Sequence, residues 1–112
     1  MMDLIIETAK RGNDVVLTIK GRLDATTAPE FSKICDGLIE SGNISLIADL
    51  GLLEYISSAG LRSILATAKK LKAMQGQIKF CNLSGMVKDV FNISGFMSTF
   101  CIYTTLEEAA AN

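Results

Sequence analysis

One stretch of the sequence decides the fold: Asp49-Leu50-Gly51-Leu52-Leu53-Glu54-Tyr55-Ile56-Ser57-Ser58-Ala59-Gly60-Leu61. The residues that lead into it, from Ile44 to Asp49, are mostly apolar, which is typical of a strand buried on both faces. We interpret the stretch after Asp49 as a loop that ends where a helix begins, so Ser58 is expected at or beside the helix N-cap. In open α/β sheets, functional groups gather where strands end and the following helices begin.

The chain after this stretch alternates between helices and strands. The spacing of apolar residues after Ser58 predicts a helix, the second of the chain, which Gly76 ends. The predicted elements are, in order, a helix from about 58 to 75, a strand over 77–82, a short helix from Ser84 to near Gly95, a strand over about 100–104 and a terminal helix opened by the capping box Thr105-Leu106-Glu107-Glu108.

The chain before this stretch opens with a predicted hairpin. Strands are expected over about 3–9 and 14–20, because a Gly-Asn-Asp turn signal stands between them. Thr27-Ala28-Pro29-Glu30 reads as a capping box with Pro in the first turn, and it predicts a helix that Gly42 ends. One face of that helix is apolar, at Phe31, Ile34, Cys35, Leu38 and Ile39.

These elements predict the order β-β-α-β-α-β-α-β-α. Alternating strands and helices indicate an α/β fold with a mixed, mostly parallel sheet of about four to five strands, packed by about four helices. The opening hairpin places one antiparallel strand at an edge. With 112 residues and no linker or repeat, we expect a single domain over residues 1–112.

The composition excludes several classes of function. With 11 Lys+Arg against 12 Asp+Glu, the formal net charge is −1, which predicts no nucleic-acid partner and no acidic membrane surface. The chain has no His, so triads with a His base and most catalytic zinc sites are excluded. We therefore predict no metal and no cofactor.

Cysteine usage and hydropathy predict the compartment. Cys35, Cys81 and Cys101 are odd in number and widely spaced, so we interpret them as reduced core residues of a cytoplasmic protein. The N-terminus, residues 1–7, lacks the basic region and long apolar run of a signal peptide. No apolar run approaches the ~20 residues of a transmembrane helix, so no membrane insertion is expected.

The serine pair allows two interpretations. On spacing alone, the simpler one is that Ser57 or Ser58 caps the helix, which contributes about 0.5 to 2 kcal/mol, while Gly60 permits close packing. The other is phosphorylation of a hydroxyl, which adds a charge of about −1.5 to −2 where the free N–H groups of a helix start tolerate an anion. Such a phosphate would change which surfaces can dock.

Catalysis by this chain is disfavoured. A receiver-type phospho-aspartate at Asp49 would need an acidic pair after the first strand to hold Mg²⁺, and Ala9-Lys10-Arg11 stands there. A serine nucleophile would need an activating base, and Ser58-Ala59-Gly60 lacks the G-x-S-x-G elbow. No catalytic residue is assigned.

The segment Asp49-Leu50-x-x-Leu53-x-Tyr55-Ile56-Ser57-Ser58-Ala59-Gly60-Leu61 resembles the signature of the sulfate transporter and anti-sigma factor antagonist (STAS) domain, in its small stand-alone branch. A second block, Gly21-Arg22-Leu23-Asp24 followed by Thr27, resembles another motif of that family. The resemblance extends along essentially the whole chain, to the late Val87-x-x-x-Phe91-x-x-Ser94-Gly95 helix.

The resemblance implies a partner-switching anti-sigma factor antagonist (an anti-anti-sigma factor) that takes part in transcription regulation. The unphosphorylated form would bind an anti-sigma factor that is also an ATP-using serine kinase, and so release a sigma factor. Phosphorylation of Ser58 would switch binding off, and a PP2C-type serine phosphatase would reverse it. By position, the partner-binding surface would comprise Asp24, Ser57, Ser58, Ala59, Gly60 and Leu61.

One position departs from the family pattern. Ser57 stands where the family very often has Asp, which removes a negative charge beside the acceptor and adds a second hydroxyl. We therefore rank the acceptors Ser58, then Ser57, then Ser63, because a hydroxyl inside the helix is less available to a kinase.

Two rival functions and one basic cluster stay open. A STAS subunit that regulates a membrane transporter, such as a lipid-trafficking ABC system, would need no phosphorylation. A small hydrolase, transferase or nucleotide-hydrolysing protein is weaker, because no phosphate loop of the G-x-x-x-x-G-K-[ST] kind is present. Lys69, Lys70 and Lys72 form a basic cluster that complements a helix dipole at its negative end or marks a binding spot.

Overall fold

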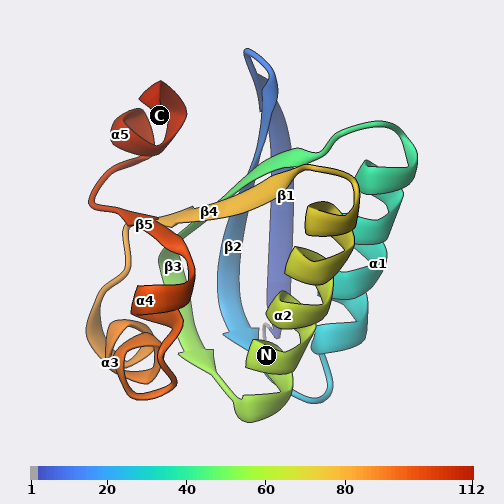
Figure 1. The fold of residues 1–112 in the computed structure, drawn as a ribbon. Helices are drawn as coiled ribbons and strands as arrows, with labels where there is room; N and C mark the ends of the chain where they lie inside the picture. The colour runs from blue at the N-terminus through green and yellow to red at the C-terminus, as the bar shows by residue number, and fades with distance from the viewer. Residues whose placement is uncertain (1–2) are drawn as a thin grey trace.

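The computed structural model describes residues 3–112. Met1 and Met2, which begin the N-terminal segment that we expect not to be a signal peptide, lie outside the described residues. Five strands form one mixed sheet in the order β1-β2-β3-β4-β5 (Figure 1). The elements are β1 (Leu4–Arg11), β2 (Asp14–Leu23), α1 (Ala28–Glu40), β3 (Ser45–Ile56), α2 (Ser58–Ala73), β4 (Gln77–Cys81), α3 (Gly85–Ile93), α4 (Phe96–Thr99), β5 (Cys101–Tyr103) and α5 (Leu106–Ala111). The predicted α/β class, the mixed, mostly parallel sheet and the order of the strands along the chain are confirmed.

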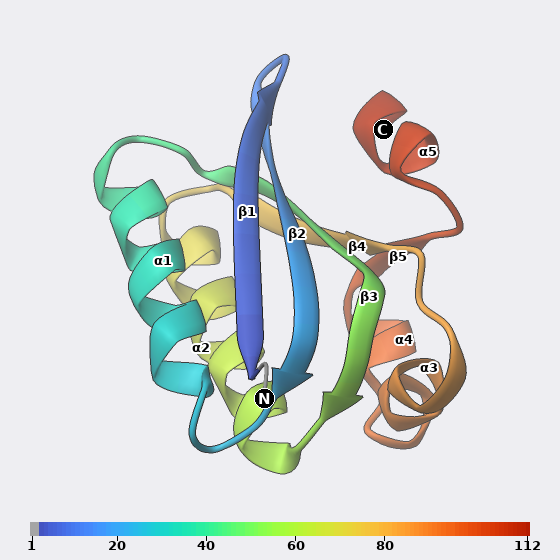
Figure 2. The same ribbon diagram turned by 180° about the vertical axis from the view of Figure 1, so that it is seen from behind.

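The hairpin puts β1 antiparallel to β2 at one edge, as predicted, while the other neighbouring strands are parallel (Figure 2). Helices α1 to α4 pack on one face of the sheet over the main core, which is built around buried side chains such as Leu17, Phe31 and Phe80. Helix α5 lies apart from them and covers Val16, Ile47 and Cys81 on the opposite face (Figure 1).

The predicted ends of two strands were wrong. We expected β2 to stop near residue 20 and β3 near Asp49, but the two strands stay paired as far as Leu23 and Ile56. Two register irregularities, between Thr18 and Lys20 and between Gly21 and Arg22, interrupt the alternation of apolar and polar side chains that marks a strand in a sequence. The stretch from Asp49 to Ile56 is therefore strand rather than loop.

The short helix α4 was not predicted, so five helices replace the expected four. Gly95 adopts a φ of 83°, in the left-handed region, and this conformation separates α3 from α4. With only four residues, α4 is too short to show helical periodicity in the sequence.

Of the two predicted capping boxes, one forms its hydroxyl bond and the other does not. The Thr105 hydroxyl oxygen accepts a hydrogen bond from the Glu108 N–H at 3.1 Å, as expected at the start of α5. At the start of α1, the Thr27 side chain makes no cap bond, because its hydroxyl donates to the Arg22 carbonyl at 2.8 Å and accepts from the Asp24 N–H at 2.9 Å. The capping box predicted at Thr27 was wrong.

Two of the three cysteines lie in the core, as expected. Cys35 and Cys81 are buried, and burial raises the pKa of each thiol to about 12. Cys101 is exposed, because it begins β5 at the edge of the sheet. A three-residue edge strand has too little cover to bury both of its faces.

Candidate functional site

The two serines occupy different positions at the start of α2. Ser57 is the N-cap, with extended backbone, and its hydroxyl oxygen accepts a hydrogen bond from the Gly60 N–H at 3.3 Å. Ser58 is the first residue of the helix and is exposed. Within residues 3–112, no hydrogen bond engages the Ser58 hydroxyl. Ser58 thus lies beside the N-cap as expected, and its hydroxyl is the freer of the two.

Gly60 explains how α2 approaches the sheet so closely. A β-carbon built on Gly60 would lie 2.6 Å from the Leu23 carbonyl oxygen and 2.9 Å from Cγ1 of Ile56. The Ser57 N–H donates to that same Leu23 carbonyl at 3.0 Å. The end of β2 and the start of α2 are therefore held together through backbone contacts that a larger residue would block.

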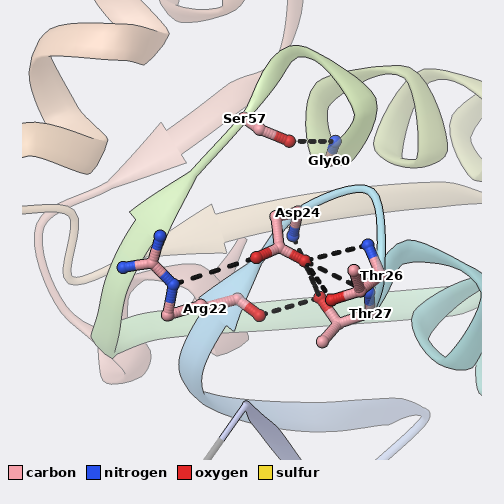
Figure 3. A network of polar contacts seen from close by, with 6 residues as sticks. All are labelled: Arg22, Asp24, Thr26, Thr27, Ser57 and Gly60. Carbon is pink, nitrogen blue, oxygen red and sulfur yellow. Dashed lines mark hydrogen bonds and ion pairs between the residues drawn. The ribbon is translucent and has the colours of Figure 1, made fainter.

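Asp24 follows Leu23 directly and lies beside the turn that carries Ser57 (Figure 3). Its Oδ1 accepts hydrogen bonds from the Thr26 hydroxyl at 2.7 Å, the Thr26 N–H at 3.0 Å and the Thr27 N–H at 3.3 Å. These bonds, the one from the Thr26 hydroxyl above all, hold the pKa of the Asp24 carboxyl below its ordinary value, although its partial desolvation acts in the other direction. Asp24 is a fixed negative charge near the serines.

Arg22 and Tyr55 extend this surface, and sequence reasoning missed both. The parallel register of β2 and β3 places them opposite each other, and the Arg22 guanidinium lies 4.2 Å from the centre of the Tyr55 ring. The Nε atom of Arg22 is 3.8 Å from Oδ2 of Asp24 (Figure 3). The only sequence signal for them is that each falls inside one of the two family-like blocks.

A hollow of about 390 Å³ borders the serines on the other side. Tyr55, Ser58 and Leu61 contribute one wall, and Val90, Ile93 and Ser94 of α3 contribute the other. Ile93 is 87% exposed, the highest value among the large apolar side chains that are exposed in residues 3–112. It points away from the face of α3 that buries Val87 and Phe91. The helical period of 3.6 residues already separates Ile93 from that face, so the sequence contained a signal for its exposure.

The remaining predicted residues have distinct environments. Ala59 and Leu61 are partly exposed next to Ser58, whereas Gly60 is buried. Ser63 is 8% exposed, and its hydroxyl donates to the Gly60 carbonyl at 2.6 Å. Burial and this bond separate Ser63 from the surface that carries Ser57 and Ser58.

Residues 3–112 contain no group of three or more Cys, Asp or Glu side chains arranged to hold a metal ion. In the same range, none of the helices has both the length and the apolar character needed to cross a bilayer.

The STAS domain family matches residues 6–109, nearly the full chain. The protein belongs to the STAS family. A Bordetella bronchiseptica protein, BtrV, which carries a provisional name as an anti-sigma factor antagonist, is 37% identical over 97 residues, covering 87% of this chain and 84% of its own. Among solved structures, an anti-sigma factor antagonist from Mycobacterium paratuberculosis has a TM-score of 0.88 at 22% identity and covers 97% of this chain and 92% of its own, which shows that this STAS domain shares its fold.

The phosphorylated form of SpoIIAA, a Bacillus cell fate determinant, is also similar to this STAS domain. Its TM-score is 0.71 at 25% identity, with 96% of each chain covered. The resemblance drawn from the serine-bearing stretch and the Gly21–Asp24 block is thereby confirmed at the level of the family.

Proposed function

We propose that this STAS domain is an anti-sigma factor antagonist that docks through the surface around Ser58 and is switched off by phosphorylation of that residue. The observation that carries the proposal is the position of Ser58. It is exposed, it is the first residue of α2, and it lines the hollow that Tyr55 and Ile93 also line. The names of the relatives, as anti-sigma factor antagonists, support the same function.

The surface combines the features of a protein interface. Asp24 and an arginine stacked on Tyr55 lie near Ser58, and the exposed apolar side chain of Ile93 lines the same hollow as Tyr55 and Ser58. Arginine and aromatic residues are enriched at the energetic centres of interfaces, and apolar anchors fill pockets there. The partner proposed for it is an anti-sigma factor that is also an ATP-using serine kinase.

Phosphorylation would act on docking rather than on the fold. The first turn of α2 holds no acidic residue, so its N–H groups and the helix dipole favour an added anion at Ser58. A phosphate with a charge of about −1.5 to −2 would nonetheless place a strongly hydrated group in the middle of the contact area. The same fold would then lose its partner, and a PP2C-type phosphatase would restore binding.

The N-cap role of Ser57 favours Ser58 as the hydroxyl that the kinase modifies. The Ser57 oxygen already accepts the Gly60 N–H, so a kinase would have to draw this hydroxyl away from the N-cap bond to modify it. Ser58 carries no such role, which supports the order Ser58, then Ser57, then Ser63. In this proposal the chain is a substrate and a binding protein of the cytoplasm, and its partners supply the catalysis.

Intact-mass analysis after incubation with the cognate kinase and ATP tests the phosphosite. One added phosphate is expected for the natural chain and for Ser57→Ala, and none for Ser58→Ala. An equal yield of phosphorylated Ser58→Ala would overturn the assignment of the acceptor. Binding of the unmodified chain to the kinase, measured separately, tests the antagonist function itself.

A further inference from the structure

A second hollow, of about 380 Å³, is lined by the C-terminal half of α2, by β4 and by the start of β5. Its walls are mainly apolar and come from elements far apart in the chain, namely Leu65 and Ala68 of α2, Ile78 of β4, and Phe100. Its size lies within the range of small-molecule sites, about 300 to 1,000 Å³. It is formed by the half of α2 that is remote from Ser58.

Two lysines, Lys69 and Lys72, line the hollow, and no acidic residue does. Within residues 3–112, neither forms an ion pair, whereas Lys70 between them donates to Asp36 of α1 at 2.7 Å. The helix dipole explains a cation in the last turn, which includes Lys70 and Lys72 but not Lys69. Lys69 and Lys72 therefore lie beside an apolar groove without an acidic partner in the described residues, and the ion pair between α2 and α1 uses Lys70 instead.

We propose that this groove binds an amphipathic carboxylate of the fatty-acid class, with the alkyl chain against Leu65, Ala68 and Phe100 and the carboxylate near Lys69 and Lys72. The charge complementarity calls for an anion, and the apolar walls call for a hydrocarbon. Gly76 and Gln77, just past the C-terminal end of α2, also line the hollow, so the negative end of the helix dipole opposes an anion there and opposes a doubly charged phosphate more than a singly charged carboxylate. The inference is independent of the phosphorylation switch at Ser58.

Cys101 provides a reporter inside the groove. Its thiol is exposed and lines the hollow, while Cys35 and Cys81 are buried. A water-soluble disulfide reagent such as DTNB should therefore modify Cys101 alone in the native protein. A ligand seated in the groove covers this thiol and slows the reaction.

The rate of Cys101 modification is measured against octanoate, decanoate and dodecanoate, each below its micelle concentration. Saturating dodecanoate is expected to slow modification at least tenfold. The concentration for half-protection should fall about fourfold per added methylene until the groove is full, which is the increment for burial of one CH₂ group. Decanol, with no carboxylate, should protect more weakly than decanoate. Absence of protection by all three acids would overturn the proposal.

The double variant Lys69→Gln/Lys72→Gln tests the carboxylate contact, and Lys70→Gln is the matched control. Exposed ion pairs contribute little each, so a loss of about fivefold in decanoate affinity is expected for the double variant, with less than a twofold change for the control. Thermal unfolding checks that each variant folds. Equal protection of the natural chain and the double variant would refute a carboxylate site.

Discussion

Gly60 at the start of α2 packs against the carbonyl oxygen of Leu23 at the end of β2. A β-carbon at residue 60 would lie 2.6 Å from that oxygen, closer than a carbon and an oxygen can approach. This contact sets the distance between Asp24, which follows β2, and the serines Ser57 and Ser58 at the start of α2. The proposed docking surface therefore depends on a residue that contributes no side chain to it.

Gly60→Ala is expected to destabilise the protein although alanine favours helices. The added methyl group must displace α2 from β2, and overpacking of this kind costs about 1 to 3 kcal/mol. Gly37→Ala in α1 is the control, because nothing lies within 4 Å of a β-carbon there. That variant should gain about 0.5 to 1 kcal/mol. Urea unfolding of both measures the difference, and a neutral or stabilising Gly60→Ala would contradict the packing argument.

The two serines should differ in their effect on stability. Ser57→Ala removes the cap bond to Gly60 and is expected to lower the free energy of unfolding by about 1 kcal/mol. Ser58→Ala removes a hydroxyl that makes no hydrogen bond within residues 3–112, and it should change the free energy of unfolding by less than about 0.5 kcal/mol. A larger loss in Ser58→Ala than in Ser57→Ala would reverse the assignment of the N-cap.

Ile93→Ser is expected to weaken docking to the anti-sigma partner at least tenfold without loss of stability. The side chain is 87% exposed in the free protein, so its removal costs the fold little, while a buried anchor at an interface contributes about 1 to 2 kcal/mol or more. Met86→Ser, at the other end of α3, is the control, because Met86 is also exposed but does not line the hollow. Calorimetric titration of both variants distinguishes an anchor from general surface hydrophobicity.

Lys79 holds α5 on the sheet, a role that the sequence did not suggest. It is 2% exposed, and its Nζ donates to the carbonyl oxygens of Ala109 at 2.8 Å and Asn112 at 3.1 Å. Lys79→Met should lower the free energy of unfolding by about 1.5 to 3 kcal/mol and speed amide exchange in α5. Lys88→Met, at an exposed position, should do neither. Unchanged exchange in α5 would show that the apolar contacts of Ala109 suffice.

The pKa of Asp24 should lie below the ordinary value of an aspartate, and Thr26→Val should raise it, because the bond from the Thr26 hydroxyl is the main cause of the shift. A lowered pKa in the folded state stabilises the fold at pH above the pKa of the unfolded chain. That contribution is lost as the pH falls through the folded pKa. The Asp24 carboxyl resonance, followed by NMR in both proteins, measures the change; coincident titrations would contradict the assignment.

Local patterns predicted much of the fold. The hairpin turn, the apolar faces of α1 and α2, and the position of Ser58 follow from short-range periodicity and turn chemistry, and the structure agrees with them. The errors arose where distant residues compete for the same group. Thr27 has the sequence of an N-cap, yet its hydroxyl is taken by the backbone at Arg22 and Asp24. Likewise, β3 continues to Ile56 because β2 remains beside it.

The sequence by itself determined the order of the elements other than α4, and that Ser58 would stand at the start of α2, because both depend on residues a few positions apart. Only the tertiary structure decided that Asp24, Tyr55 and Ile93 would surround that serine, and that Lys69 and Lys72 would border an apolar groove. Those residues belong to different strands and helices. Their proximity comes from parallel sheet pairing and from the close packing of α2 on β2, which no local pattern encodes.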